Sequence, residues 1–139
     1  MVDAQQDIKK DRPVYRNIGL AQLIKYRLPW AGKVSILHRI SGAVLFLLLP
    51  FILYLFDQSL ASELSYQKFQ AITSNIWVKI ICLGLIWCFL HHFCAGIRYL
   101  LLDLEIGIEK TEANRSAIFV FCLGLALTAV VGLKMFGFY

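Results

Sequence analysis

Three long stretches without a formal charge constrain this sequence more than any other feature. Residues 40–56, 80–97 and 116–133 contain no Asp, Glu, Lys or Arg. A helix that crosses the hydrocarbon core of a bilayer needs about 20 predominantly apolar residues, within a range of about 17–25. Each stretch reaches that length because flanking Lys and Arg side chains can extend toward the headgroups. The sequence therefore predicts three membrane-spanning helices.

The composition agrees with a membrane protein. Of the 139 residues, 59% are apolar and 17% are charged, whereas soluble domains have roughly 45–50% and about 25%. These values exclude a disordered chain, a disulfide-stapled secreted module and a water-soluble enzyme. The four cysteines lie in apolar stretches without a CxxC pair, so no disulfide framework or structural metal is expected.

We therefore predict an all-α membrane protein with one transmembrane domain over residues 1–139. Residues 1–30 form a basic cytoplasmic or interfacial arm, and the spans cover approximately 31–57, 74–102 and 114–136. Within the arm, residues 18–30 mix apolar and basic side chains, a pattern typical of a segment that lies along the membrane surface. Pro29 is expected to end that segment, and Trp30 to anchor it at the interface.

The basic residues predict the orientation of the chain. Eight of them lie in the stretch that ends at Arg39 and three in the connection between the second and third spans, against two in the first connection and one in the tail. The positive-inside rule then places the N-terminus in the cytoplasm and the C-terminus outside it. The net charge of +5 would suggest nucleic acid in a soluble protein. Here it indicates contact with anionic membrane lipid instead.

Polar residues inside the predicted spans mark the candidate site, because ionisable groups are costly in hydrocarbon. One cluster at the start of the first span comprises Ser35, His38, Arg39 and Ser41. A second cluster toward the end of the second span comprises His91, His92 and Arg98. Because the second span runs back toward the side on which the first begins, both clusters are expected at similar depth near the cytoplasmic leaflet.

A histidine in an apolar helix suggests a haem ligand. His92 belongs to a stripe of period four with Gly84, Cys88 and Gly96, so small residues would let a flat macrocycle approach the backbone. The alternative for His92 is a hydrogen bond to a neighbouring helix. His91 has the bulky Trp87 one turn before it, which favours a packing or partner-facing role.

A single ligand leaves a low-spin haem incomplete. His38 is expected close to the water interface beside Arg39, and we interpret the two side chains as donors near the haem propionates. The second axial ligand would then come from another membrane subunit. Ser35 and Arg39 also fit a simpler interpretation as interfacial capping and snorkelling residues.

Two motifs carry a family resemblance. The stretch SILHRISG at residues 35–42 contains S-x-x-H-R-x-[ST], and HFCAGIRYLLLD at residues 92–103 follows on the second predicted span. Together with the upstream Arg12-Pro13, these motifs resemble those of the cytochrome b subunit of succinate dehydrogenase (complex II). The resemblance spans the whole chain. The chain departs from the family pattern at Tyr99, where His or Phe is more usual, and in the additional His91.

The resemblance implies roles for individual residues. His92 matches the haem b axial ligand, with the second axial ligand supplied by the partner anchor subunit. Ser35 and Arg39 match residues of the ubiquinone pocket, and His38 and Arg39 match positions near the haem propionates. Ser35 would donate a hydrogen bond to a quinone carbonyl, and Arg39 would stabilise negative charge on the reduced quinone.

The same resemblance implies the setting. Arg98 and Asp103 match the polar end of the second motif, where a supporting role near the quinone or at a subunit contact is expected. The chain would form half of a heterodimeric anchor in the bacterial inner membrane. It would hold an iron–sulfur subunit and a flavoprotein subunit, in which succinate oxidation occurs.

Three alternatives stay open from the sequence. A fumarate reductase anchor has the same architecture, because the direction of electron flow is not specified by these residues. Another haem-b electron-transfer subunit would carry both axial ligands itself. A purely structural or transport subunit would bind no haem.

Overall fold

The computed structural model describes residues 19–138, and within that range the chain forms helices and no strand. The helices are α1 (Leu20–Lys25), α2 (Trp30–Ala61), α3 (Glu63–Thr73), α4 (Ile76–Asp103) and α5 (Lys110–Met135). Three of them, α2, α4 and α5, are long and apolar enough to cross a membrane. The predicted fold class is therefore confirmed. The Arg12-Pro13 pair lies outside the described residues.

Local sequence signals set the helix ends. Pro29 precedes α2 in an extended conformation, with ψ at 161°. The side chain of Asn75 begins α4 by accepting a hydrogen bond from the backbone N–H of Trp77 at 2.9 Å. Asn is a favoured N-cap for this reason, and it delays the start of α4 to Ile76. The helix begins two residues after the approximate start expected for the second span.

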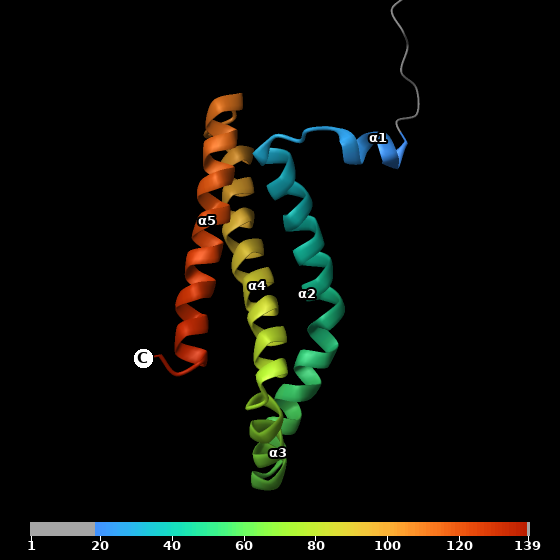
Figure 1. The fold of residues 1–139 in the computed structure, drawn as a ribbon, viewed down its shortest axis with the longest axis vertical. Helices are drawn as coiled ribbons and strands as arrows, with labels where there is room; N and C mark the ends of the chain where they lie inside the picture. The colour runs from blue at the N-terminus through green and yellow to red at the C-terminus, as the bar shows by residue number, and fades with distance from the viewer. Residues whose placement is uncertain (1–18, 139) are drawn as a thin grey trace, which may run out of the picture.

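The first long helix extends past its predicted span. α2 has 32 residues, which corresponds to about 48 Å, whereas the hydrocarbon core of a bilayer is about 30 Å thick. Its last turns and α3 form a helical pair at one end of the bundle (Figure 1). Pro50 lies inside α2, where a membrane helix can tolerate it.

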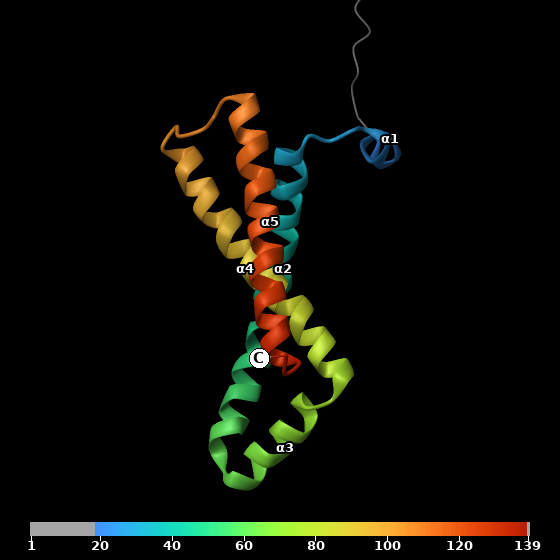
Figure 2. The same cartoon turned by 60° about the vertical axis from the view of Figure 1, so that its left-hand side comes forward.

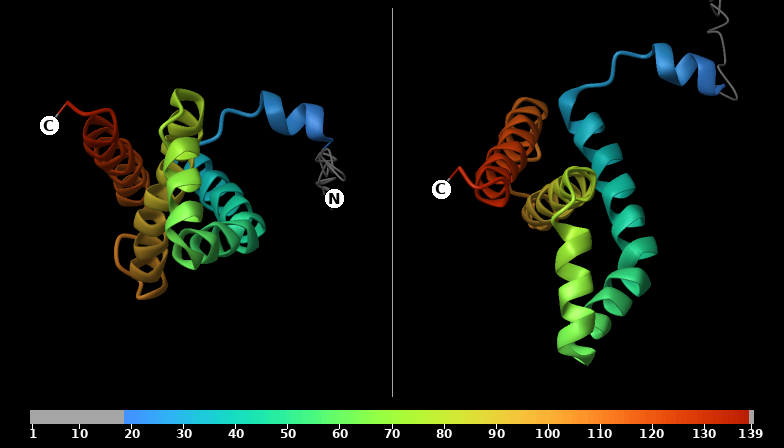
Figure 3. Two further views of the ribbon diagram at one scale, coloured as in Figure 1. Left: turned by 90° about the horizontal axis from the view of Figure 1, so that it is seen from below. Right: turned by 60° about the horizontal axis from the view of Figure 1, so that its bottom comes forward.

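The three long helices run side by side, with α4 packed against both α2 and α5 (Figures 1 and 2). The start of α2, the end of α4 and the start of α5 lie at one end of the bundle, and α3 lies at the other. α1 stands away from the three long helices (Figure 3). This helix is shorter than the interfacial segment predicted over residues 18–30.

Small residues of α5 form its contact with α4. Gly124, Thr128 and Gly132, spaced four residues apart, are all buried. A Cβ atom built on Gly124 would lie 3.5 Å from the Cα atom of His91, and one on Gly132 would lie 3.2 Å from Leu83 Cδ1. The stripe that marks a helix-packing face in the sequence therefore lies inside the bundle, where it lets the two backbones approach.

We predict that Gly124→Leu destabilises the bundle by about 1–3 kcal/mol, the usual range for overpacking a filled interior. The added side chain would meet the α4 backbone at His91. Ala126→Leu is the matched control, because Ala126 is exposed on the opposite face of α5. Thermal unfolding of the detergent-solubilised protein measures both variants. Equal unfolding temperatures for the two would contradict the packing argument.

Candidate functional site

The two polar clusters meet where α2 crosses α4. The imidazole rings of His38 and His92 stack with their centroids 4.2 Å apart and their planes 6° apart. A Cβ atom on Gly42 would lie 2.8 Å from Cε1 of His92, a separation that real Cβ contacts do not reach. Glycine at position 42 therefore allows α2 to lie directly against the His92 ring.

Hydrogen bonds fix the orientation of His92. Its Nδ1 atom lies 3.1 Å from the backbone carbonyl of His38 and 3.4 Å from Oγ of Ser41. The Ser41 hydroxyl donates its own hydrogen to that same carbonyl at 2.9 Å. Since a carbonyl only accepts, Nδ1 of His92 carries the hydrogen and donates it. The neutral ring then has an unprotonated Nε2, which forms no hydrogen bond with any residue from 19 to 138.

This hydrogen bonding is compatible with metal binding by His92. Histidine ligands commonly donate one ring N–H to a carbonyl or carboxylate, which fixes the tautomer and directs the other nitrogen at the metal. Among the described residues, no three His, Cys, Asp or Glu side chains gather to hold a metal ion by themselves. A haem iron, which takes only axial ligands from protein, fits this donor set.

Ser35 and Arg39 lie on α2 beside this contact. Ser35 precedes Gly42 by seven residues, which places it two turns away on the same side of the helix. Ser35 is half-buried and Arg39 is exposed. Neither side chain forms a hydrogen bond or ion pair with the part of the chain that the structure describes.

Tyr99 is a site residue that the residue types alone did not single out. Its ring centroid lies 5.0 Å from that of His38, so His38 contacts both His92 and Tyr99. The spacing contained a signal, because Tyr99 follows His92 by seven residues and hence shares its face of α4. The position is also one at which the chain departs from the family pattern.

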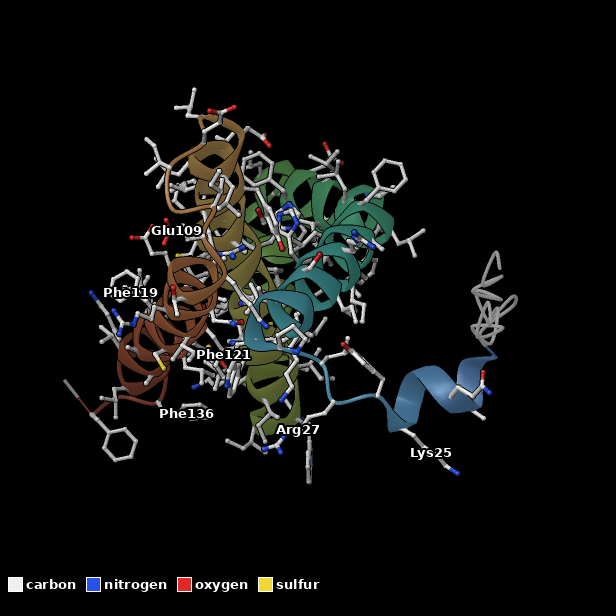
Figure 4. All side chains as sticks on the ribbon, turned by 90° about the horizontal axis from the view of Figure 1, so that it is seen from above. Lys25, Arg27, Glu109, Phe119, Phe121 and Phe136 are labelled. Carbon is white, nitrogen blue, oxygen red and sulfur yellow. The ribbon has the colours of Figure 1, made fainter. Side chains whose placement is uncertain are left out.

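His91 faces α5, whereas His92 faces α2. His91 is fully buried, stacks on Trp87 at 5.3 Å and meets the edge of Phe121 at 6.2 Å. Figure 4 shows Phe121 directed into the bundle and Phe119 directed away from it. Of the two interpretations given for His91, packing inside this chain agrees with its burial, and a partner-facing position does not.

Arg98 joins α4 to α5. Its Nε donates to Oγ of Ser116 at 3.0 Å, and its Nη2 donates to the backbone carbonyl of Ala113 at 2.9 Å. Only 5% of its surface is exposed. Asp103, the last residue of α4, is exposed at the same end of the bundle. The structure thus directs Arg98 to α5, a partner that the motif spacing did not indicate.

The fold and this site define a class: a multi-pass membrane protein with a histidine held between two of its apolar helices. Residues 9–131 match the family of the succinate dehydrogenase/fumarate reductase transmembrane subunit. The chain belongs to this family.

Three relatives carry the name succinate dehydrogenase cytochrome b556 subunit. The chain is 36% identical to the protein of Coxiella burnetii over 111 residues, which cover 79% of this chain and 89% of the relative. It is 29% identical to that of Paracoccus denitrificans over 92 residues, covering 66% and 71%. It is 26% identical to that of Rickettsia felis over 132 residues, covering 94% and 98%.

We predict that Arg98→Ala lowers the free energy of unfolding by about 1.5–3 kcal/mol, the range for hydrogen bonds to a charged group. The change would remove both hydrogen bonds from α4 to α5, leaving the Ala113 carbonyl with the Ser116 hydroxyl as its side-chain donor. Arg115→Ala is the control, because Arg115 is exposed one turn into α5. Thermal unfolding in detergent compares the two. A loss of stability in Arg115→Ala as large as in Arg98→Ala would contradict a specific role for the α4–α5 hydrogen bonds.

Proposed function

We propose that this chain is the membrane-anchor subunit of a succinate:quinone oxidoreductase, binding haem b and forming part of the site at which ubiquinone is reduced. The family membership and the names of its relatives support the anchor role. Flavin and iron–sulfur chemistry then belongs to two soluble subunits that the anchor holds at the membrane.

The hydrogen bond from Nδ1 of His92 to the His38 carbonyl is the observation that carries the haem assignment. With Nδ1 so engaged, Nε2 would bind the haem iron, and glycine at position 42 leaves room for the ring. His38 and Arg39 would hold the propionates. The second axial ligand comes from a second membrane-anchor subunit. Bound haem supplies a one-electron reservoir beside the quinone site.

Ser35 and Arg39 supply the polar groups of the quinone site. The Ser35 hydroxyl donates a hydrogen bond to one quinone carbonyl, and the Arg39 guanidinium stabilises the negative charge that reduction places on the ring. Both effects are stronger in a membrane than in water, because the surroundings have a low dielectric constant. Protons would come from the aqueous side near the start of α2.

The arrangement of the helix ends supports the orientation. The start of α2 and the α4–α5 connection lie at the same end of the bundle (Figure 1). Among the described residues, most of the basic side chains lie toward that end, which favours a cytoplasmic location for it by the positive-inside rule. We assign the chain to a bacterial inner membrane, with its C-terminus in the periplasm and the soluble subunits bound at the cytoplasmic end. Asp103, which is exposed at that end, would support the subunit contact there, and the buried Arg98 would support it only through its hydrogen bonds to α5.

A fumarate reductase anchor is the second candidate, because the description of the matching family names both enzymes. The two differ in the direction of electron flow. Measuring succinate oxidation and fumarate reduction with the same purified complex distinguishes them. A chain that purifies alone with a fully ligated haem would instead be an independent haem-b protein.

We predict that His92→Ala abolishes haem binding, because it removes the axial nitrogen. His91→Leu is the matched control: it removes the neighbouring imidazole, which is buried toward α5. The reduced-minus-oxidised absorption spectrum of solubilised membranes is the measurement. A haem band that persists in His92→Ala and disappears in His91→Leu would reverse the assignment of the two histidines.

We predict that Arg39→Leu lowers quinone-dependent succinate oxidation by about tenfold to a hundredfold, the factor expected for losing a hydrogen bond to a charged group. Reduction of a water-soluble dye by the soluble subunits should be unchanged. Lys33→Leu removes another exposed positive charge from the start of α2 and serves as the control. If the wild-type protein, Arg39→Leu and Lys33→Leu had equal quinone-dependent rates, Arg39 would be ruled out of the quinone site.

A further inference from the structure

The first turn of α2 has no cap of its own. Pro29 at the N-cap position offers no side-chain hydrogen bond, and the first turn contains no acidic residue. The first N–H groups of a helix need acceptors from outside it. At α2 the N–H of Ala31 donates to Oδ1 of Asn114 at 3.1 Å. Ala31 is the second residue of the helix, where a capping side chain ordinarily binds. The cap of α2 therefore comes from α5.

Contacts with both other long helices hold Asn114 in place. Ala113, the residue before it in α5, and Ser116, two residues after it, accept the two hydrogen bonds of Arg98 in α4. Two turns further along α5, the ring of Phe121 lies 5.8 Å from that of Trp30, the first residue of α2. The start of α5 is thus tied to α4, and through Asn114 it sets the position of the start of α2.

We infer that Asn114 is a positioning residue for the quinone site, an inference that rests on the function proposed above. Ser35 and Arg39 follow Ala31 by four and eight residues, or by about 6 and 12 Å along the helix. Fixing the Ala31 amide fixes the depth and rotation at which these two side chains are presented. Asn114 acts through the backbone of α2 and touches no substrate.

The test uses membranes that contain the whole complex assembled around this chain. Asn114→Ala should raise the apparent KM for ubiquinone about fivefold, the factor that corresponds to losing one helix cap. Its rate with the water-soluble dye should be unchanged. Hydrogen–deuterium exchange should become faster in the peptide that contains Ala31. Asn114→Asp should restore both the KM and the slow exchange, because a carboxylate accepts the same hydrogen bond and is favoured at a helix N-terminus.

Asn75→Ala is the matched control. It removes a cap of the same type, at 2.9 Å, from the start of α4 at the other end of the bundle. Its KM for ubiquinone should not change. The inference is overturned if Asn114→Ala leaves the KM or the Ala31 exchange unaltered, if Asn75→Ala raises the KM equally, or if Asn114→Asp fails to restore it.

The outcomes separate this inference from the proposed function. Impaired quinone reduction in Arg39→Leu together with a normal KM in Asn114→Ala would overturn only the role of Asn114. Normal quinone reduction in Arg39→Leu and Ser35→Ala would overturn the quinone site itself. In that case faster exchange at Ala31 in Asn114→Ala would show a helix cap without a role in quinone binding.

Discussion

The rest of the site depends on the close approach of α2 to α4 at Gly42. With any larger residue there, the His92 ring would have to move, because a Cβ atom would lie 2.8 Å from it. The same approach brings the His38 carbonyl within 3.1 Å of Nδ1. One glycine therefore determines both where the imidazole lies and which of its nitrogens is protonated.

The adjacent histidines illustrate how helix geometry divides roles. Consecutive residues of a helix are about 100° apart, which follows from 3.6 residues per turn. Because α4 packs between α2 and α5, His92 meets α2 and His91 meets α5. The buried His91 packs beside Gly124, and neither of its ring nitrogens has a hydrogen-bond partner among the described residues. The half-buried His92 is held by its Nδ1 hydrogen bond. Their chemical difference arises from the packing around them and not from the residue type.

Much of the fold and part of the candidate site could be predicted from the sequence, because they depend on local sequence patterns. Charge-free stretches indicate the three long helices, and the direction of successive spans brings His38 and His92 to one depth. The sequence could not indicate that Asn114 caps α2 or that Arg98 bonds to α5. Those contacts join segments 83 and 15–18 residues apart, and they depend on the rotation of each helix in the bundle. Tyr99 is an intermediate case. Its seven-residue spacing from His92 could be read from the sequence, but its contact with His38 could not.

The contacts made by α5 show why the motifs on α2 and α4 do not form the candidate site by themselves. α5 contains none of the signature residues, yet its first turns accept hydrogen bonds from both motif-bearing helices. Association of helices in a membrane relies on packing and hydrogen bonds, because lipid tails are as apolar as the side chains. The small-residue stripe packs α5 against α4, and the polar contacts of α5 with both α2 and α4 help to set the separation of these two helices at that end. That separation decides whether the His38 carbonyl reaches His92, so the geometry of the candidate site is a property of all three helices.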